Sequence, residues 1–461
     1  MQKGRTGLDL TTLLAKWTGD LSGMQERRTI RVLTTYNRTL YFIDKGVERG
    51  TAADQGRLLE TELNKTLADG HLKVNVLFVP VSRDELLPAL VDGRGDVVMG
   101  NLTVTPERRQ IVDFVDPWIA NVDEIVVTGP NVPAIASLDD LSGREVFVRE
   151  SSSYYQSLKA LNEDFAKRGL EPVTIVPAPE ELEDEDLMEM AAAGLVKVLI
   201  VDNHKAWFWQ RVIPSLKVYP EAALRKGADI AWAIRKDSPQ LKTALNAFLA
   251  KNGRDSLNGR MIFRRYLLNT RYVKSATADA EMKRFKALIA YFRKYGSEYN
   301  LDWMLMSAQG YQESRLDQEA RSHVGAVGVM QLMPPTGREM KVDITKTEGN
   351  IHGGVKYIRF MIDKYYKDEP MNDLNKVLFA FASYNCGPGR VRQLRREAAA
   401  RGLDANVWFD NVERIAAEKI GRETVTYVSN IYKYYVSYLL VQGEYINRRN
   451  ARKAFSSPGR D

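Results

Sequence analysis

Short apolar runs alternate with amphipathic stretches along the first part of the chain. The runs at 30–33, 74–79 and 96–99 are rich in valine and other apolar residues and have the length of buried β-strands. Between the first two runs, leucines recur at helical spacing, as at Leu59 and Leu63. We therefore predict a domain in which strands and helices alternate, which is the α/β pattern.

Two helix starts in this domain carry recognisable capping residues. Ser82 and Glu85 have the spacing of a capping box in front of a helix that begins near Leu86. Thr105 followed by Pro106 predicts a second helix start, because threonine caps a helix well and proline is favoured in its first turn.

The pattern changes after a small, polar stretch at 274–280. From Phe285 onward the apolar residues recur at helical spacing, and no convincing strand precedes Leu440. A chain of 461 residues is also too long for one hydrophobic core. We predict an N-terminal segment at 1–28, an α/β domain at 29–268, a linker at 269–284, a mainly α-helical domain at 285–445 and a disordered basic tail at 446–461.

The net charge of +7 favours an anionic partner without naming it. Most basic residues are scattered, and the one dense cluster lies in the tail, at Arg448, Arg449, Arg452, Lys453 and Arg460. No nucleic-acid-binding motif accompanies this cluster. We therefore expect a solvated tail and no nucleic-acid partner.

Cysteine, histidine and hydropathy patterns exclude other classes. The single cysteine, Cys386, excludes an intrachain disulfide, and the four histidines lack the spacing of metal ligands. We therefore expect no metal site and no cofactor. The chain has no apolar run of about 18 residues, the length of a transmembrane helix, and residues 1–20 lack the apolar core of an export signal.

Glu313 is the main candidate for a catalytic residue. It closes an unusually apolar helical stretch at 301–312 and is followed by Ser314 and by a glycine-broken loop at 324–331. Burial against apolar neighbours would raise its pKa toward neutrality, which is the property that a general acid needs. The alternative for a glutamate at a helix end is a side chain that points into water.

Three later segments add motifs to Glu313 and Ser314. Residues 328–331 read Gly-Val-Met-Gln, residues 382–387 read Ala-Ser-Tyr-Asn-Cys-Gly, and residues 423–428 read Glu-Thr-Val-Thr-Tyr-Val. Together, and in this order, the four motifs resemble the soluble lytic transglycosylase family. The resemblance implies a lysozyme-like, mainly α-helical catalytic domain.

The resemblance implies cleavage of the β-1,4 bond between N-acetylmuramic acid and N-acetylglucosamine in peptidoglycan. Glu313 would first protonate the leaving oxygen and then, as a base, activate the C6 hydroxyl of the same muramic acid, which gives a 1,6-anhydro product. This route needs no second carboxylate. The nearest ones in sequence, Asp317 and Glu319, follow what we predict to be the end of the helix.

The resemblance also implies roles for the neighbours of Glu313. Tyr427 would orient Glu313, and Met330 would pack against a sugar ring. The other implied contacts with the glycan are made by Ser314, Gln331, Tyr384 and Asn385. As alternatives, Tyr384 and Tyr427 could be core residues with a satisfied hydroxyl, and Met330 could equally be a core residue.

Three segments of the α/β domain, at 100–108, 138–143 and 231–239, carry a second resemblance. They are similar to the solute-binding proteins of the polar amino-acid family over 29–268. Such proteins have two α/β lobes that are joined by two crossing strands and close on a ligand. The resemblance therefore implies a two-lobed, periplasmic-binding-protein-like domain.

This resemblance implies ligand contacts at particular residues. Arg108 falls on the arginine that pairs with the α-carboxylate of the ligand, with Thr103 beside it. Asp202 follows an apolar run and falls on the acid that holds an ammonium group. Tyr41 or Phe42 would supply an aromatic wall. The alternative for Arg108 is a surface charge.

Two other segments modify this expectation. The loop at 149–155 departs from the pattern of the transport receptors, which predicts a different ligand or none. We interpret the acidic segment at 180–186 as the solvated start of a helix, because acidic residues suit a helix N-terminus and the spacing of a calcium loop is absent.

The order of the two domains resembles the membrane-bound lytic transglycosylases of type F. We therefore expect a periplasmic enzyme of cell-wall degradation, associated peripherally with the outer membrane, whose export signal is not visible in this sequence. Its substrate would be the glycan strands of peptidoglycan. A muropeptide or an amino-acid-like effector, bound between the N-terminal lobes, would regulate it. Two alternatives are a goose-type lysozyme that hydrolyses the same bond and a non-catalytic cell-wall sensor.

Overall fold

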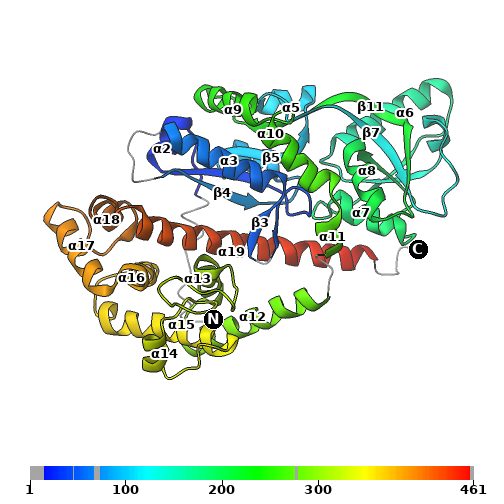
Figure 1. Cartoon of the computed structure of the whole chain (residues 1–461). Helices are drawn as coiled ribbons and strands as arrows, with labels where there is room; N and C mark the ends of the chain where they lie inside the picture. Colours follow the sequence, from blue (N-terminus) through cyan, green and yellow to red (C-terminus); the bar gives the residue numbers. More distant parts are fainter. Residues whose placement is uncertain (1–14, 45, 67–72, 276–278, 457–461) are drawn as a thin grey trace.

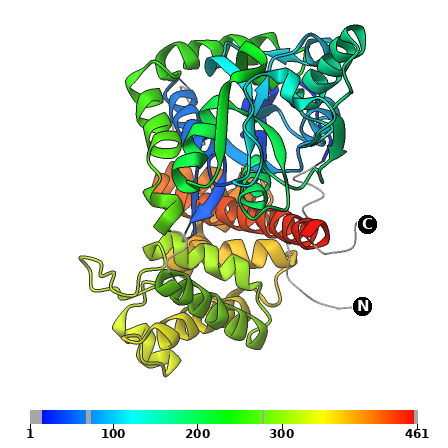
Figure 2. The ribbon, with the colours of Figure 1, turned by 90° about the vertical axis from the view of Figure 1, so that its right-hand side faces the viewer.

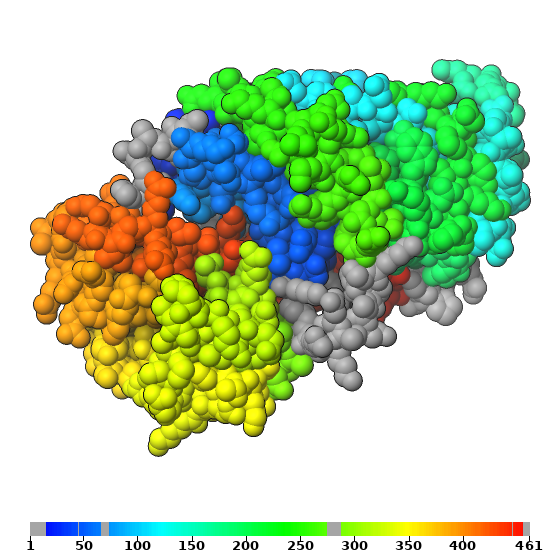
Figure 3. Space-filling model, in the orientation of Figure 1, coloured from blue at the N-terminus to red at the C-terminus, as the bar shows by residue number. Residues whose placement is uncertain are grey.

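The computed structural model describes residues 15–44, 46–66, 73–275 and 279–456. An α/β body from the N-terminal part lies beside a helical body from the C-terminal part, and the long helix α19 (Arg422–Ser456) runs between them (Figure 1). A view turned by 90° separates the same two bodies (Figure 2). The space-filling view shows the yellow and orange helical body packed below the blue and green α/β body (Figure 3). The predicted fold class is confirmed.

Two long strands, β7 (Ile119–Thr128) and β11 (Lys217–Ile234), pair antiparallel and cross from one half of the α/β body to the other. They separate lobe 1 from lobe 2. The elements of lobe 1 are α2 (Leu21–Glu26), β1 (Thr29–Thr34), β2 (Phe42–Asp44), β3 (Val47–Arg49), α3 (Thr51–Thr66), β4 (Asn75–Pro80), α4 (Leu86–Val91), β5 (Val97–Thr103), α5 (Pro106–Ile111), β6 (Asp113–Phe114), α9 (Pro239–Asn252), α10 (Leu257–Phe263) and η2 (Arg264–Leu268). The elements of lobe 2 are η1 (Leu138–Leu141), β8 (Glu145–Val148), α6 (Ser153–Arg168), β9 (Thr174–Pro177), α7 (Asp184–Ala192), β10 (Val198–Asp202) and α8 (Asn203–Val212).

One sheet of nine strands runs through both lobes in the order β4-β1-β5-β11-β7-β10-β8-β9, with β6 paired to β11. The strands β4, β1 and β5 are parallel, as are β10, β8 and β9. Neighbouring residues of one strand point to opposite faces of the sheet, and in the central strands residues on both faces are buried. In β1, for example, Val32 joins the apolar cluster on one face and Leu33 joins the cluster on the other.

Two helices connect the lobes to the helical body, α11 (Arg271–Ser275) and α12 (Asp279–Glu298). Helix α12 already packs in the core of the helical body. The further elements of the helical body are α13 (Trp303–Ser314), α14 (Pro334–Met340), α15 (Thr347–Met361), η3 (Ile362–Tyr366), α16 (Asp373–Cys386), α17 (Pro388–Ala400), η4 (Trp408–Val412) and α18 (Glu413–Ile420), followed by α19. One apolar core joins these helices, and fully buried residues such as Met306, Phe381 and Val428 belong to it.

Two helix starts test the capping predictions. The prediction at Thr105 is confirmed, because its hydroxyl oxygen accepts a hydrogen bond from the Arg108 backbone N–H at 3.3 Å. The capping box at Ser82 and Glu85 is wrong. The Ser82 hydroxyl donates to Asp84 Oδ1 at 2.6 Å instead, and Glu85 precedes α4 without a side-chain cap.

The predicted segment boundaries also shift. Residues 15–28 pack on lobe 1, where the Arg27 guanidinium lies 3.8 Å from the centre of the Trp17 ring and the Trp17 backbone N–H donates to Gly93 O at 2.9 Å. The described part of the linker at 269–284 is largely helical, because it contains α11 and the first residues of α12. Residues 276–278 lie outside the described residues.

The expectation of a disordered tail at 446–461 is wrong for the part that the structure describes. Helix α19 continues to Ser456, because its basic residues have acidic partners on lobe 2. Arg448 pairs with Glu185 and with Asp186, each at 2.6 Å. Residues 457–461 lie outside the described residues.

Candidate active site

Helix α13 positions Glu313. Asp302 begins the helix by accepting a hydrogen bond from the Met304 backbone N–H at 2.8 Å. The helix ends right after Ser314, because Arg315 adopts the left-handed conformation with φ 58° and its N–H donates to Tyr311 O at 2.8 Å. Glu313 therefore lies in the last turn, as the sequence predicts, and its side chain is partly exposed at the surface of the core.

The environment of the Glu313 carboxyl group is neutral. Burial raises the pKa of Glu313 to about 7, and a hydrogen bond from Tyr427 acts against the rise. The Tyr427 hydroxyl donates to Glu313 Oε1 and itself accepts from Gln309 Nε2 at 3.3 Å. The rise is in the direction that the apolar sequence around Glu313 indicates. A carboxyl group with this pKa is partly protonated near neutral pH, and it is equally able to donate a proton or to accept one.

Asp317 and Glu319 do not lie opposite Glu313 on its helix. The chain turns away at Leu316, whose φ of 63° is also left-handed. Asp317 is exposed, and its Oδ1 accepts from the Glu319 backbone N–H at 2.9 Å. Among the described residues, no charged group contributes to the pKa shift of Glu313. A glycosidase with two carboxylates across the scissile bond would show such a contribution.

The loop at 324–332 is held against the end of α13 by buried hydrogen bonds. Ser314 Oγ donates to Val329 O at 2.9 Å. The fully buried Asn350 accepts from the Met330 backbone N–H and donates to Val327 O, both at 2.7 Å. The Tyr384 hydroxyl donates to Met330 O at 2.6 Å. Side chains from α13, α15 and α16 therefore fix the path of this loop.

Met330 differs from its expected role. Its side chain is fully buried and packs on Gly310 and Gly354, where an added Cβ would lie 3.1 Å and 2.6 Å from the nearest Met330 atoms. A larger residue at Gly354 would displace the methionine, and one at Gly310 would crowd its sulfur atom. The side chain therefore supports the loop from inside the core, which is the alternative that the sequence left open for Met330.

The other predicted glycan contacts remain at the surface. Gln331 is partly exposed, has φ 45°, and donates from Nε2 to Gly328 O at 2.9 Å. Asn385 is partly exposed, and its Oδ1 accepts from the Thr424 hydroxyl at 2.6 Å. Each of these side chains keeps polar atoms for a ligand, because an amide group has more donor and acceptor positions than these bonds use.

Sequence reasoning missed two residues of this site. Gln309 is fully buried one turn before Glu313, and its amide donates a hydrogen bond to the Tyr427 hydroxyl. Asn350 on α15 is also fully buried and holds the loop at Met330. A polar amide inside an otherwise apolar helical stretch was the available signal, since a buried amide needs partners.

The cleft between the lobes brings together some of the predicted ligand residues. Arg108 and Thr103 line one cavity with the loop at 151–153. The Arg108 guanidinium, however, donates to Thr103 O at 2.8 Å and to Ser151 O at 3.0 Å. Asp202 is buried beside this cavity, where it pairs with Lys205 at 2.9 Å and accepts from Asn101 at 3.1 Å.

The aromatic wall differs from the prediction. Tyr41 is fully buried, stacks on Phe78 with ring centres 4.9 Å apart, and donates its hydroxyl to Glu48 Oε1 at 2.9 Å. Phe42 is also buried and stacks on Tyr272 in the core of lobe 1. The larger interlobe cavity is lined instead by three tryptophans, Trp118, Trp209 and Trp232.

The acidic segment at 180–186 is not a solvated helix start throughout. Glu183, Asp184, Glu185 and Asp186 are all buried, because basic residues from three parts of the chain surround them. Their partners are Arg83 from lobe 1, Arg149 and Lys205 from lobe 2, and Arg448 from α19. Burial acts to raise the pKa of Asp184, but the charges of Lys205 and Arg149 outweigh it and hold this pKa below its ordinary value.

In the described ranges of the chain, no helix has both the length and the hydrophobicity needed to cross a membrane. In that same part of the molecule, no three histidine, cysteine or acidic side chains are grouped closely enough to hold a metal ion.

Comparison with protein families locates both bodies. A model of the transglycosylase SLT domain matches residues 290–407, and a model of the bacterial extracellular solute-binding proteins of family 3 matches residues 30–266. The first match includes Glu313 and Asn385 and ends before Tyr427.

Two relatives match this chain over most of its length. A membrane-bound lytic murein transglycosylase F from Desulfosudis oleivorans is 30% identical over 439 residues, which covers 89% of this chain and 90% of that protein. A protein of the same name from Shewanella frigidimarina is 26% identical, and the match covers 90% of this chain and 87% of that protein. Among solved structures, an ancestral arginine-binding protein bound to arginine matches 52% of this chain and 98% of its own, with 26% identity and a TM-score of 0.44.

The helical body with Glu313 and the two-lobed body before it define the class, which is a peptidoglycan lytic transglycosylase with an attached solute-binding domain. The chain belongs to the family of the membrane-bound lytic murein transglycosylases F.

Proposed function

We propose that the chain cleaves the β-1,4 bond between N-acetylmuramic acid and N-acetylglucosamine and leaves a 1,6-anhydromuramic end. The pKa of about 7 at Glu313, to which no charged group among the described residues contributes, carries this proposal. One carboxyl group that is equally ready to give and to take a proton suits a reaction in which the same residue does both.

The proposed proton path begins and ends on Glu313. The protonated carboxyl group donates to the bridging oxygen while the C1–O bond breaks, which releases the N-acetylglucosamine hydroxyl. The C6 oxygen of the muramic acid then forms a bond to C1, and its proton passes to the Glu313 carboxylate. The residue is protonated again, and no water is consumed. An intramolecular nucleophile has a high effective concentration, so no second carboxylate is needed.

Tyr427 is proposed to orient Glu313, since its hydroxyl donates to the carboxylate. Gln331 and Asn385 are proposed to bind sugar substituents directly, because both amides are partly exposed. Three residues are proposed to act indirectly, by fixing the loop at 324–332 beside Glu313. They are Ser314, Met330 and Tyr384.

The two lobes are proposed to bind a cell-wall peptide or an amino-acid-like effector that regulates the helical body. Helix α19 supports this link, because Tyr427 near its start contacts Glu313 and Arg448 near its end contacts lobe 2. Regulation requires that the effector bind the lobes more tightly in one arrangement than in another. The site of action is proposed to be the periplasm, at the outer membrane. The names of the relatives support this, because they contain the words membrane-bound and murein.

Digestion of purified peptidoglycan with the full chain tests the proposed reaction. Mass spectrometry is expected to find muropeptides that end in anhydromuramic acid. Products heavier by one water would instead indicate the hydrolysis of a goose-type lysozyme. Undiminished cell-wall function of a Glu313→Gln variant in cells would favour a non-catalytic sensor.

A further inference from the structure

In this cleft, the charged side chains at the positions that bind a free amino acid in a solute-binding protein already have partners within the chain. Both Arg108 contacts go to backbone carbonyls, one of them across the cleft at Ser151. The ammonium group of Lys205 lies 2.8 Å from Asp184 Oδ2 and 2.9 Å from Asp202 Oδ2. It therefore occupies the place that the ammonium group of an amino acid would need, since a carboxylate pair is what holds such a cation.

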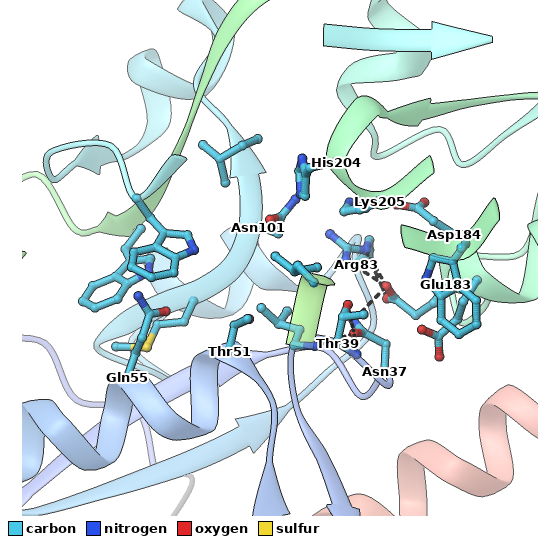
Figure 4. Close-up of a pocket in the computed structure, with 18 residues that line it drawn as sticks. Asn37, Thr39, Thr51, Gln55, Arg83, Asn101, Glu183, Asp184, His204 and Lys205 are labelled. Atoms are coloured by element: carbon cyan, nitrogen blue, oxygen red, sulfur yellow. Dashed lines mark hydrogen bonds and ion pairs between the residues drawn. The ribbon is translucent and has the colours of Figure 1, made fainter. Parts of the chain in front are cut away.

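A second ion pair crosses the cleft from lobe 1 to lobe 2. Arg83 Nε lies 3.0 Å from Glu183 Oε1 and Arg83 Nη2 lies 2.8 Å from Glu183 Oε2, which is a two-point contact between guanidinium and carboxylate (Figure 4). Asn37 Nδ2 adds a third donor to Glu183 at 3.1 Å. Arg83 lines both interlobe cavities, and Glu183 lines the larger one. A ligand carboxylate offers Arg83 the same two oxygens that Glu183 offers.

The same cavity contains buried polar atoms without partners. Both ring nitrogens of His204 and the Nε2 atom of Gln55 have no hydrogen-bond partner in the described structure, although His204 is 8% exposed and Gln55 2%. Gln55 and the Arg83–Glu183 pair lie at opposite ends of the pocket in Figure 4. Burial lowers the pKa of His204 to about 4, so its ring is neutral at physiological pH. Buried polar atoms left without partners are costly, and a ligand amide would satisfy them.

The free space is small in this arrangement. It amounts to about 30 Å³ in each of the two interlobe cavities, which is room for a few water molecules. A ligand therefore cannot be added while both lobes keep their present contacts. A side chain that now fills the cleft therefore has to move. Glu183 is the candidate, because a ligand carboxylate can take over the contacts that the two Glu183 oxygens make with Arg83.

We propose that the cleft binds the free carboxylate of a peptide-like ligand on Arg83, and that Glu183 occupies this position when no ligand is bound. The ligand has amide groups for His204 and Gln55, and its amino end is acylated, because Lys205 holds the ammonium position. Glu183 lies two residues before Glu185, which holds Arg448. The inference rests on the proposed regulatory role of the lobes and assigns the ligand class of that site.

Calorimetric titration of the full chain tests this assignment with three probes, which are N-acetyl-alanyl-alanine, the same dipeptide with a C-terminal amide, and free alanine. The carboxylate peptide is expected to bind at least about tenfold more tightly than either of the others. Glu183→Gln removes the internal competitor and is expected to tighten binding of the carboxylate peptide about tenfold, because a larger fraction of the cleft is then open to ligand. Arg94→Gln, at a more exposed arginine of lobe 1, is the matched control and is expected to change nothing.

Arg83→Gln alone would leave Glu183 buried without this cation and would destabilise lobe 2, so the double variant with Arg83→Gln and Glu183→Gln is used, with its circular dichroism spectrum as the check of folding. This variant is expected to lose the preference for carboxylate over amide. Equal binding of the two peptides, a retained preference in the double variant, tightest binding of free alanine, or no binding even to Glu183→Gln would each overturn the proposal. Lytic activity is measured separately on peptidoglycan, so failure of the binding test leaves the catalytic proposal standing and the reverse also holds.

Discussion

Helix α19 contacts acidic side chains near both of its ends, and the two environments differ. Near its start, Tyr427 offers a neutral hydroxyl to Glu313, and burial raises the pKa of Glu313 to about 7. Near its end, Arg448 offers a guanidinium to Glu185 and Asp186. Burial acts to lower the pKa of Arg448, but the charges of these two acids outweigh it and raise that pKa.

The difference shows that the neighbours of a buried acid, and not burial alone, decide its charge. Where cations surround an acid, as at Glu183 and Asp184 at the N-terminal end of α7, they hold its pKa below the ordinary value in spite of burial. Ion pairs of this acidic segment hold three parts of the chain together. Where only a hydroxyl is present, the acid keeps a proton to give. The first arrangement is suited to a structural joint and the second to proton transfer.

The largest expected effect is the loss of activity in Glu313→Gln. Glutamine keeps the size and the polarity of the side chain but cannot donate a proton, so release of soluble fragments from peptidoglycan should slow about 10³-fold. Glu319→Gln, at an exposed carboxylate nearby, is the control and should keep its rate. Similar rates for the two variants would mean that Glu313 is not the acid.

The second prediction concerns stability and pH. The ordinary pKa of a glutamate is 4.5, and that of folded Glu313 is about 7, so the folded protein binds more protons than the unfolded chain between these values. Stability contributed by this group is complete below about pH 4.5 and is lost as pH rises to about 7, by about 3 kcal/mol in total. Glu313→Gln cannot ionise and lacks this loss.

Urea unfolding of the wild-type chain and of Glu313→Gln, each at pH 4.5 and at pH 8, measures the difference. The variant should gain stability relative to the wild type on going to the higher pH, and other titrating groups cancel in the comparison. An unchanged difference between the two pH values would contradict a raised pKa at Glu313.

These two predictions concern Glu313, which the sequence could identify. Its neighbours along the helix are apolar, so the sequence itself indicates an apolar environment for the carboxyl group. The alternation of strands and helices predicts the two-lobed body for the same reason, and Thr105 carries its capping signal locally. The sequence could not reveal that the acidic segment at 180–186 is largely buried. Its partners Arg83 and Arg448 lie far away along the chain, so only the fold brings them together.

The same limit applies to Tyr41 and Met330. The sequence predicted that Tyr41 lines the ligand cleft. Its hydroxyl instead donates a hydrogen bond to Glu48 inside the core of lobe 1. Met330 is buried because two glycines on other helical turns, Gly310 and Gly354, leave space for it. In each case the deciding contact comes from an element that the local pattern does not include.

The third prediction breaks the charged joint. Arg448→Met removes the guanidinium from Glu185 and Asp186 and should lower the free energy of unfolding at pH 7 by about 2 kcal/mol. This is less than for a fully buried pair, because the Arg448 side chain is 15% exposed. Arg449→Met, on the exposed side of the same helix, is the matched control and should change stability little. Equal losses in both variants would mean that α19 is held by its apolar contacts and not by this ion pair.

The smallest expected effect tests the neutral end of α19. Tyr427→Phe removes the hydroxyl that donates to Glu313, so the carboxyl group is less well oriented and turnover should fall about tenfold. Because that hydrogen bond acts to lower the pKa of Glu313, its loss should also move the decline of activity above neutral pH to a higher pH. Tyr432→Phe on the same helix, where the ring packs against Phe409 with centres 5.0 Å apart, provides the control. A tenfold loss with an unchanged pH profile would indicate that Tyr427 only supports the packing, since a structural defect alone does not shift the titration of the acid.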